Sequence, residues 1–353
     1  MLNAYIFGGD CDKLNNYFCV MKHISILVLE DITLTSLDTA RQVFIKVNDF
    51  LREAGKISLF KIELVGRSQE TPIQDGLYTI RADRLLTDIM DTDLIIIPQL
   101  CGSFRGLIKK HAVFVPWIID KYRNGAEIAS LCAGAFLLAS TGLLKDRSCA
   151  LHWSSANEFR TMFPEVSVDD NRIITDDRGI YTSGGNYSYL NLILYLIEKF
   201  AGRQICVHVS KMFEIDIERK TQAPFMIFSG QKDHKDEVVL QAQEFIESHY
   251  QDRITIEKLA SVLLIGRRNL ERRFRKATSN TIFEYIQRVK IEAVKKGLET
   301  TRKSVFELMT EVDYLDVKSF REIFKKITGL TPAEYRKRYG LEFTTLVSTH
   351  LSR

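Results

Sequence analysis

The sequence lacks several features that would restrict its class. Its six cysteines are scattered through 353 residues and form no C-x-x-C pair, which argues against a disulfide framework and against a zinc site. The longest apolar stretches, such as 94–98 and 128–138, are too short or too interrupted to cross a bilayer. Residues 1–20 have no basic start followed by an apolar run, so they do not resemble a secretory signal. We therefore expect a cytoplasmic protein with reduced thiols and no membrane partner.

The composition is that of an ordinary globular protein, with 45% hydrophobic and 27% charged residues. A single core stops growing near about 250 residues, so the length predicts at least two domains. The net charge of +4 is uneven, because residues 231–340 carry 23 of the 49 Lys and Arg but only 17 of the 45 Asp and Glu. Within that region, residues 267–276 hold six positive side chains and one negative, a density typical of a helix that faces phosphates.

Residues 22–202 alternate short β-branched runs with helical patterns. Strands are predicted at 23–29, 57–65, 94–98, 126–131 and 148–151, with a strand pair around 176–179. Helices are predicted at 36–54, 104–123, from about 134, 154–162 and 186–200. This alternation predicts an α/β fold, a flavodoxin-like doubly wound and mostly parallel sheet. Ligands of such sheets bind beyond the carboxyl ends of the strands.

Cys132 lies between an apolar strand and a helix, in the run Ser-Leu-Cys-Ala-Gly, where a tight turn would project the thiol at the carboxyl edge of the sheet. His152 ends another predicted strand, and small-residue turns occur at 101–103 and 183–185. Together these features resemble the ThiJ/PfpI superfamily, which has a glutamine-amidotransferase-like fold, over residues 22–205. The resemblance implies a ligand site at the following positions. They are Cys101, Gly102, Ser103, Cys132, Ala133, His152, Ser183 and Gly184.

Enzymes of that superfamily usually set a glutamate against the cysteine, and the position that matches it here is Ser36. We therefore expect a non-catalytic ligand-sensing domain without cofactor or metal, in which Cys132 and His152 are vestigial catalytic residues. Two alternatives stay open. Cys132 would attack and His152 would shuttle a proton in a cysteine-dependent amidase or hydrolase, whereas a thiol redox sensor would use Cys132 alone or with Cys101.

The C-terminal part contains an internal repeat. Residues 269–278 align with 319–328 at an offset of 50, and the match continues through the Thr, Glu and Tyr of both copies at 281–285 and 331–335. Each copy has a short helix, 256–262 or 305–310, followed by a turn and a second helix, 267–276 or 317–326. Capping boxes at Thr281, Ser304 and Thr331 predict where helices begin.

A helix, a turn and a basic second helix form the unit that places a recognition helix in the major groove. Residues 236–340 resemble the AraC/XylS family of transcription regulators, with helix-turn-helix units at 256–276 and 305–326 joined by a long helix at about 282–299. The whole chain resembles the GlxA-type subgroup, in which a ThiJ/PfpI-like sensor precedes an AraC-type DNA-binding domain. The remaining segments are expected to be a disordered extension at 1–21, a linker at 206–235 and a tail at 341–353.

The resemblance places DNA-binding residues on both second helices. They are Arg267, Arg268, Asn269, Glu271, Arg272, Arg275 and Lys276 in the first unit and Val317, Lys318, Arg321 and Lys325 in the second. Two departures weaken base reading by the second unit, since Asp313 stands where the family commonly has glycine and Glu322 where it often has arginine. The expected partners are double-stranded promoter DNA, a small-molecule effector, RNA polymerase and a second copy bound through the α/β domain.

Overall fold

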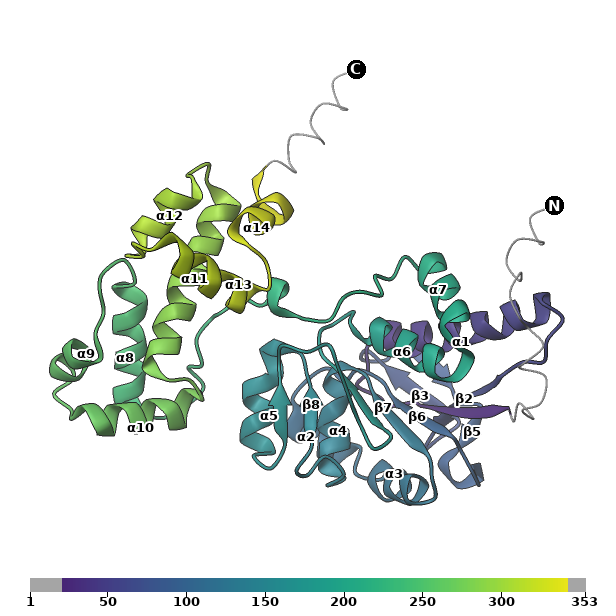
Figure 1. The fold of residues 1–353 in the computed structure, drawn as a ribbon. Coiled ribbons are helices and arrows are strands. Elements are labelled where there is room, and N and C mark those ends of the chain that lie inside the picture. The colour runs from purple at the N-terminus through teal and green to yellow at the C-terminus, as the bar shows by residue number, and fades with distance from the viewer. Residues whose placement is uncertain (1–20, 342–353) are drawn as a thin grey trace, which may run out of the picture. The chain divides into compact units, whose positions relative to one another are not determined.

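A computed structural model describes residues 21–341. The chain folds into two compact units, the first ending at Lys220 and the second starting at Thr221, and each is described by itself (Figure 1). Apart from Met21 and Leu341, the predicted extension 1–21 and tail 341–353 lie outside the described residues.

The first unit is built on a seven-stranded sheet in the order β10-β11-β7-β6-β1-β2-β5. The strands are β1 (Lys22–Leu27), β2 (Phe60–Gly66), β5 (Arg84–Leu85), β6 (Leu94–Ile97), β7 (Glu127–Ser130), β10 (Ile174–Asp177) and β11 (Ile180–Ser183). All neighbours are parallel except the β10–β11 pair. All four residues of β6 are buried, as expected of a central strand covered on both faces.

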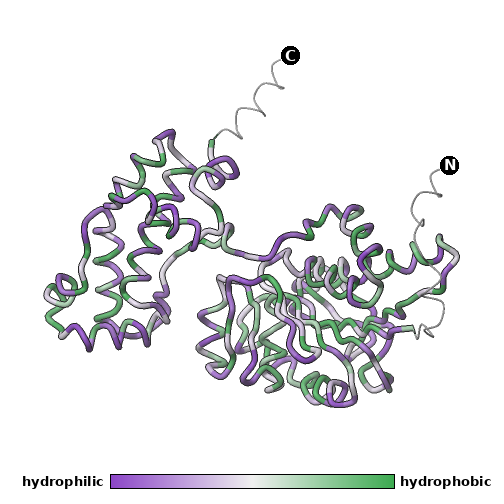
Figure 2. The backbone as a smooth tube through the Cα atoms, in the orientation of Figure 1, coloured by the Kyte–Doolittle hydropathy of each residue, from purple (hydrophilic) through white to green (hydrophobic). Residues whose placement is uncertain are grey.

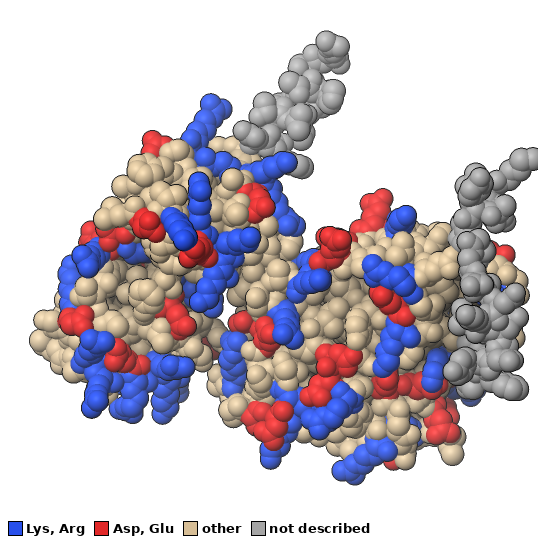
Figure 3. All heavy atoms as spheres, viewed as in Figure 1, with Lys and Arg blue, Asp and Glu red and all other residues tan. Residues whose placement is uncertain are grey.

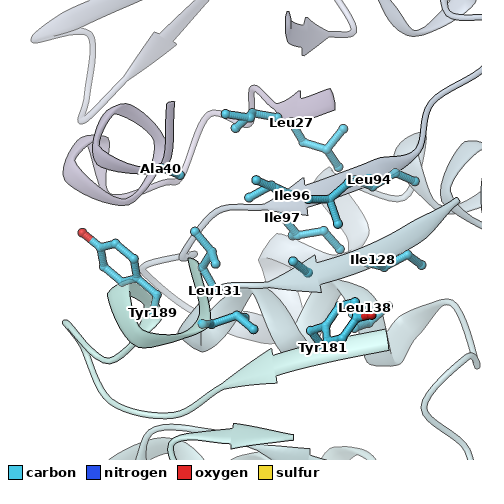
Figure 4. Packing of buried hydrophobic residues seen from close by; sticks show 14 of the residues in the cluster. Leu27, Ala40, Leu94, Ile96, Ile97, Ile128, Leu131, Leu138, Tyr181 and Tyr189 are labelled. Carbon is cyan, nitrogen blue, oxygen red and sulfur yellow. The ribbon is translucent and has the colours of Figure 1, made fainter. Parts of the chain in front are cut away.

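Helices cover both faces of this sheet, which confirms the predicted doubly wound fold. On one face lie α1 (Leu34–Glu53), α6 (Tyr189–Ala201) and α7 (Arg203–Met212), which pack on one another. On the other lie α2 (Phe104–Lys110), α3 (Phe114–Arg123), α4 (Ala135–Ser140) and α5 (Ala156–Met162) (Figure 1). Buried side chains from adjacent strands, such as Leu27, Ile96 and Ile128, form the core between the two layers (Figure 4).

Several features of this unit differ from the sequence-based expectations. The hairpin of β3 (Glu70–Ile73) and β4 (Tyr78–Arg81) was not predicted. The strand predicted at 148–151 is β8 (Ser148–Ala150), which pairs with β9 (Ser167–Asp169) in a separate two-stranded sheet. The helix predicted at 104–123 is two helices, α2 and α3.

The break between α2 and α3 follows from Pro116. Proline lacks an N–H and would interrupt the interior of a continuous helix, whereas the first turn of a helix needs no N–H partner. The chain leaves the helix after Lys110 and restarts at Phe114, which puts Pro116 in the first turn of α3.

The first unit extends beyond the end expected for it. Helix α7 occupies the start of the segment 206–235 that we expected to be a linker, and Cys206, Val209 and Ser210 are buried there. The unit ends at Lys220, so only part of the expected linker joins the two units.

The second unit is all helical, as predicted. It contains α8 (Glu237–Ser248), α9 (Ile256–Val262), α10 (Arg267–Thr278), α11 (Ile282–Thr300), α12 (Val305–Glu311), α13 (Val317–Thr328) and α14 (Pro332–Tyr339). The capping boxes predicted at Thr281, Ser304 and Thr331 are all formed, each with the glutamate three residues on. Hydrophilic and hydrophobic residues are interspersed along these helices (Figure 2), and the buried positions recur at helical spacing, as expected of helices that bury one face.

The second unit has two separate hydrophobic cores, one for each helix-turn-helix half. The first core gathers residues of α8, α9, α10 and the start of α11 around Phe274 and Tyr285. The second gathers residues of α12, α13, α14 and the rest of α11 around Phe320 and Phe324. Helix α11 contributes to both cores, because Ile286 belongs to the first and Ile291 to the second.

Between residues 21 and 341, no helix is both long enough and apolar enough to traverse a bilayer. Over the same range, no group of three His, Cys, Asp or Glu side chains is arranged to hold a metal ion.

Candidate functional site

Cys132 occupies the predicted tight turn between β7 and α4, in a short 3₁₀ turn (Cys132–Gly134). Its φ of +49° lies in the left-handed region, which is uncommon for a residue with a side chain. Gly134 makes the turn possible, since a Cβ there would lie 2.6 Å from the Pro98 carbonyl oxygen and 2.8 Å from that of Ile97. The turn therefore packs directly on the carboxyl end of β6.

The Cys132 thiol is shielded from solvent. The residue is 3% exposed, and its backbone N–H donates to the Ser183 hydroxyl at 3.1 Å. Burial raises the pKa of the thiol to about 12, although the backbone N–H groups of Ala133 and His152 act in the opposite direction. Thiolate is the reactive form of cysteine, so this environment holds Cys132 in its unreactive, protonated form at neutral pH.

His152 approaches Cys132 through its backbone rather than through a catalytic side-chain contact. Its imidazole Nδ1 accepts the Ser154 N–H at 3.1 Å and lies 2.7 Å from the Ser154 hydroxyl, which caps the turn Trp153–Ser155. Burial lowers the pKa of the imidazole, so the ring favours its neutral form. The side chain thus holds a local turn.

Ser36, the position matched to the superfamily's glutamate, lies in the first turn of α1 and is fully buried. Its hydroxyl donates to the Thr33 carbonyl at 2.8 Å and accepts the Gln99 N–H at 3.0 Å. Ser36 therefore ties α1 to the end of β6.

The neighbouring carboxylates are held in ion pairs. Glu30 pairs with Arg67 at 2.6 Å and with Lys110 at 2.8 Å, and Lys110 also pairs with Asp31 at 2.8 Å. The hydrogen bond from Lys110 lowers the pKa of Glu30. These acids are engaged with cations instead of serving as a proton acceptor for Cys132.

The predicted ligand-binding residues fall into two groups. Cys132, Ala133, Ser183 and Gly184 are buried at the ends of β7 and β11, with His152 half-buried beside them. In contrast, Cys101, Gly102 and Ser103 are exposed in the loop between β6 and α2. Cys101 approaches the Thr33 hydroxyl at 3.6 Å, which places this loop beside the start of α1.

Sequence reasoning missed Gln99 and Tyr189 at the same edge. Gln99 follows β6 and donates from Nε2 to Asn186 at 2.6 Å, while its Oε1 is buried without a hydrogen-bond partner among the described residues. Tyr189, labelled in Figure 4, is buried, and burial raises the pKa of its phenol, with a further contribution from nearby Cys132. The available signal was that Gln99 directly follows the predicted strand 94–98 and that Tyr189 lies in the first turn of the predicted helix 186–200.

Helix α10 presents a positively charged surface in the second unit. Leu270, Phe274 and Thr278 face its core. The opposite face carries exposed Arg267, Arg268, Asn269, Arg272, Arg275 and Lys276, with Glu271 partly buried. Figure 3 shows Lys and Arg side chains gathered over this helix. Six of the seven residues predicted to bind DNA here are exposed to solvent.

Several of the charged side chains on α10 have partners within the protein. Arg267 pairs with Glu257 at 2.5 Å and with Glu271 at 3.2 Å. Arg267 and Glu271 must therefore break these ion pairs before they bind bases. Arg273 makes two hydrogen bonds to Asp236, at 2.6 and 2.9 Å. Asp236 caps α8, so this pair fixes α10 against α8.

Helix α13 repeats the arrangement in the second half. Phe320, Phe324 and Thr328 are buried, and Val317, Lys318, Arg321 and Lys325 are exposed on the other face. Asp316 caps the helix through the Ser319 N–H at 2.6 Å.

The turn before α13 explains one departure from the family pattern. Asp313 has a φ of +58°, the left-handed conformation that glycine adopts most readily and aspartate tolerates better than most residues. Lys290 of α11 lies 3.8 Å from the Asp313 carboxylate and donates to the neighbouring Val312 carbonyl at 2.8 Å. The turn therefore keeps its shape without glycine.

Comparison with known families agrees with this division of the chain. Residues 39–199 match the DJ-1/PfpI family, and residues 259–338 match a family described as a helix-turn-helix domain. The chain therefore contains a DJ-1/PfpI domain followed by an AraC-type helix-turn-helix domain.

Relatives that match across parts of both units are named as regulators. The HTH-type transcriptional regulator GbdR of Pseudomonas aeruginosa is 25% identical over 324 residues, which cover 89% of this chain and 84% of that protein. The HTH-type transcriptional regulator GlxA of Rhizobium meliloti is 25% identical over 222 residues, or 62% of this chain and 67% of the relative.

A relative of the helical unit is more similar over a shorter span. The bifunctional transcriptional activator/DNA repair enzyme AdaA of Bacillus subtilis is 34% identical over 101 residues, which cover 29% of this chain and 48% of that protein.

Among solved structures, a candidate transcriptional regulator from Vibrio parahaemolyticus superposes with a TM-score of 0.50 at 18% identity. The match covers 55% of this chain and 99% of the other, and it supports the fold of the α/β unit.

Proposed function

We propose that this protein is a transcription regulator that binds promoter DNA through α10 and α13. The observation that carries the proposal is the duplicated helix-turn-helix unit, in which each second helix buries one apolar face and exposes a face with cations. Exposed arginines on such helices hydrogen-bond to guanine edges, and lysines neutralise phosphates. The names of the relatives GbdR and GlxA agree with this role.

The α/β unit is proposed to bind a small-molecule effector at the carboxyl edge of its sheet. The buried, unpaired Oε1 of Gln99 supports this site, because a buried acceptor without a partner is costly unless a ligand or water donates to it. Cys132, Ser183 and Gly184 lie at the ends of the neighbouring strands β7 and β11. A thermal-shift screen against small nitrogenous metabolites tests the assignment, with Gln99→Leu as the variant that removes the acceptor.

We propose that this unit senses its ligand without turning it over. The raised pKa of Cys132 and the local role of the His152 imidazole support this view. Hydrolysis of amide or ester substrates that disappears in Cys132→Ala would contradict it. DNA binding is expected to persist in that variant.

The protein is further proposed to act in the cytoplasm as a homodimer joined through its α/β units, and to contact RNA polymerase at the promoter. Two copies provide two DNA contacts and therefore more specificity than one. Sedimentation that finds only monomer at micromolar concentration would contradict the dimer.

The central experiment is a selection of binding sites from random duplexes with the full-length protein. A recovered consensus that is bound about 10³-fold or more tightly than scrambled duplex at physiological salt is expected of a sequence-specific regulator. Equal affinity for selected and scrambled duplexes would overturn the proposed function.

A further inference from the structure

The two helix-turn-helix halves need a rigid connection if α10 and α13 are to contact one duplex in a fixed register. Each half has its own hydrophobic core, and α11 is the helix that enters both. A second element also contacts both halves. It is the segment 223–231, which follows closely after the end of the α/β unit at Lys220 and which we call the brace.

The first end of the brace contacts the second half. Ala223 and Pro224 lie against Gly329, the residue that ends α13, since a Cβ added to Gly329 would be 3.5 Å from the Ala223 Cβ and 3.6 Å from the Pro224 Cδ. The Phe225 ring packs edge-on to Tyr339, and the Arg338 guanidinium lies 4.8 Å from the centre of that Phe225 ring. The brace therefore touches both α13 and α14.

The middle of the brace is held by two residues of α11. Lys295, which is 3% exposed, donates from Nζ to the Met226 carbonyl at 2.6 Å and to Glu292 at 2.7 Å. The same Glu292 oxygen accepts the Phe228 N–H at 3.2 Å. A buried ammonium and its carboxylate thus satisfy one donor and one acceptor of the brace backbone, a charge-assisted arrangement that resists displacement.

The other end of the brace contacts the first half. The Phe228 ring packs edge-on against Tyr285 with 5.0 Å between centroids. The Gln231 carbonyl accepts from buried Gln243 at 3.0 Å, and its side-chain oxygen accepts from Asn280 at 3.1 Å. Gly230 has a φ of +73°, and a Cβ there would be 2.5 Å from the Tyr285 hydroxyl oxygen. The chain passes too close to Tyr285 for any side chain at this position.

The space left beside the brace does not favour a ligand site. The cavity between the brace, α11 and the end of α13 has a volume of about 30 Å³, which is room for a water molecule. The contacts are those of a packed structural element.

We propose that the brace fixes the spacing of the two recognition helices and is the element through which the α/β unit changes DNA binding. This inference rests on the proposed function. The chain enters the brace closely after Lys220, so a shift of the α/β unit pulls first on residues that hold α13 and α14 and then on those that hold Tyr285. Loosening the brace leaves α11 as the main link and lets the two halves turn relative to each other.

The test is discrimination between DNA sites of different spacing, measured with full-length protein. Inserting one base pair between the two contacted stretches of the selected site moves them apart by about 3.4 Å and rotates them by about 35°. The native protein is expected to bind the altered site at least about tenfold more weakly. Gly230→Ala and Lys295→Met are expected to reduce this difference to about threefold or less, because they release the brace.

Gly55→Ala is the matched control for Gly230→Ala. Gly55 has a similar φ of +70°, but a Cβ there meets nothing within 4 Å, so it imposes the same backbone strain without displacing a neighbour. It is expected to keep native discrimination. If one brace variant fails to fold by circular dichroism, the other decides the result.

The outcomes separate the two proposals. Brace variants that fold and discriminate between the two spacings as strongly as the native protein would overturn the role of the brace. A native protein that selects no site at all would overturn the proposed function instead. Native protein that binds both spacings equally well would also overturn the brace, since no fixed spacing would then exist.

Discussion

At the residue scale, the cations of α10 fall into two groups. Arg273 is committed to Asp236 and Arg267 to two glutamates, whereas Arg268, Arg275 and Lys276 are exposed. Arg272 is exposed as well. It donates to the Asn269 side chain at 2.9 Å, and this hydrogen bond holds the Arg272 and Asn269 side chains on the outer face of the helix. A helix that is basic in sequence is therefore only partly available to DNA.

Replacing Arg272 with alanine is expected to weaken binding to the selected site by about 1–3 kcal/mol and to relax the base preference at one position. Lys276→Ala is the matched control, because removing a cation that binds phosphate weakens binding to all sequences alike and lowers the salt dependence. Both effects are measured by titrating selected and scrambled duplexes at several salt concentrations. Equal losses of affinity on both duplexes for both variants would refute the assignment.

The cysteine thiols differ in their exposure and therefore in their expected rate of alkylation. With a pKa of about 12 and 3% exposure, Cys132 stays protonated and protected through neutral and mildly alkaline pH. Iodoacetamide at about pH 8, near the usual thiol pKa, is therefore expected to label exposed Cys101 well before Cys132. Peptide mapping by mass spectrometry measures the order. Rapid labelling of Cys132 in folded protein would instead favour the enzyme or redox alternatives.

At the element scale, the turn after β7 depends on Gly134. Alanine there would place a methyl group 2.6 and 2.8 Å from two backbone oxygens of β6 and its following residue, neither of which can rotate away. We expect Gly134→Ala to destabilise the α/β unit by more than about 3 kcal/mol, the range of severe overpacking. Denaturant unfolding measures the change.

Gly106→Ala in α2 is the control for that substitution. A Cβ at Gly106 meets nothing within 4 Å, and alanine is a better helix former than glycine. This variant is expected to be neutral or more stable by up to about 1 kcal/mol. A Gly134→Ala protein as stable as the Gly106→Ala protein would show that the turn is not tightly packed.

The ion pair between α8 and α10 predicts that the stability of the second unit depends on pH. Hydrogen bonds from Arg273 lower the pKa of Asp236, so the pair stabilises the folded unit above the aspartate pKa of the unfolded chain, about 3.9, and this contribution is lost at lower pH. Asp236→Asn is expected to lower Tm at pH 7, by a difference that shrinks on acidification.

Asp316→Asn is the matched control, since asparagine still caps a helix and Asp316 caps α13 through Ser319. It is expected to change Tm less than Asp236→Asn at pH 7. A pH-independent effect of Asp236→Asn would assign its role to capping alone.

The elements that could be predicted from the sequence are those with local signals. The bounds of α9 agree with the prediction at both ends, and α11 starts at the residue that its capping box predicts. The hairpin β3–β4 was missed because most of β4 is exposed and β3 contains Pro72, which a strand pattern disfavours. Helix α7 was missed because its mixed polar sequence resembles a linker.

The site was predictable only as far as chain position determines it. Cys132 and Ser183 lie at strand ends, and the sequence places strand ends at one edge of the sheet. The partner of Arg273 lies 37 residues away in the chain, and nothing near either residue indicates that they meet. Tertiary contacts of this kind also decide that the Cys132 thiol is buried.

At the scale of the whole molecule, the two units have separate cores and divide between Lys220 and Thr221. We expect two unfolding transitions in calorimetry and a fragment of residues 221–353 that folds and binds the selected DNA. The fragment is expected to be monomeric, because dimerisation is proposed for the α/β unit. If protein cut near Lys220 still unfolded in a single calorimetric transition, the two units would not fold independently.

The position of α7 has a practical consequence for anyone who recombines such proteins. A graft made at residue 205, the boundary expected from the sequence, cuts through a helix and leaves Val209 and Ser210 without the surface that buries them. Joining a foreign sensor domain at Thr221 instead transfers the brace together with the DNA-binding unit. A chimera made there keeps the segment through which ligand binding to the new sensor is proposed to change DNA binding.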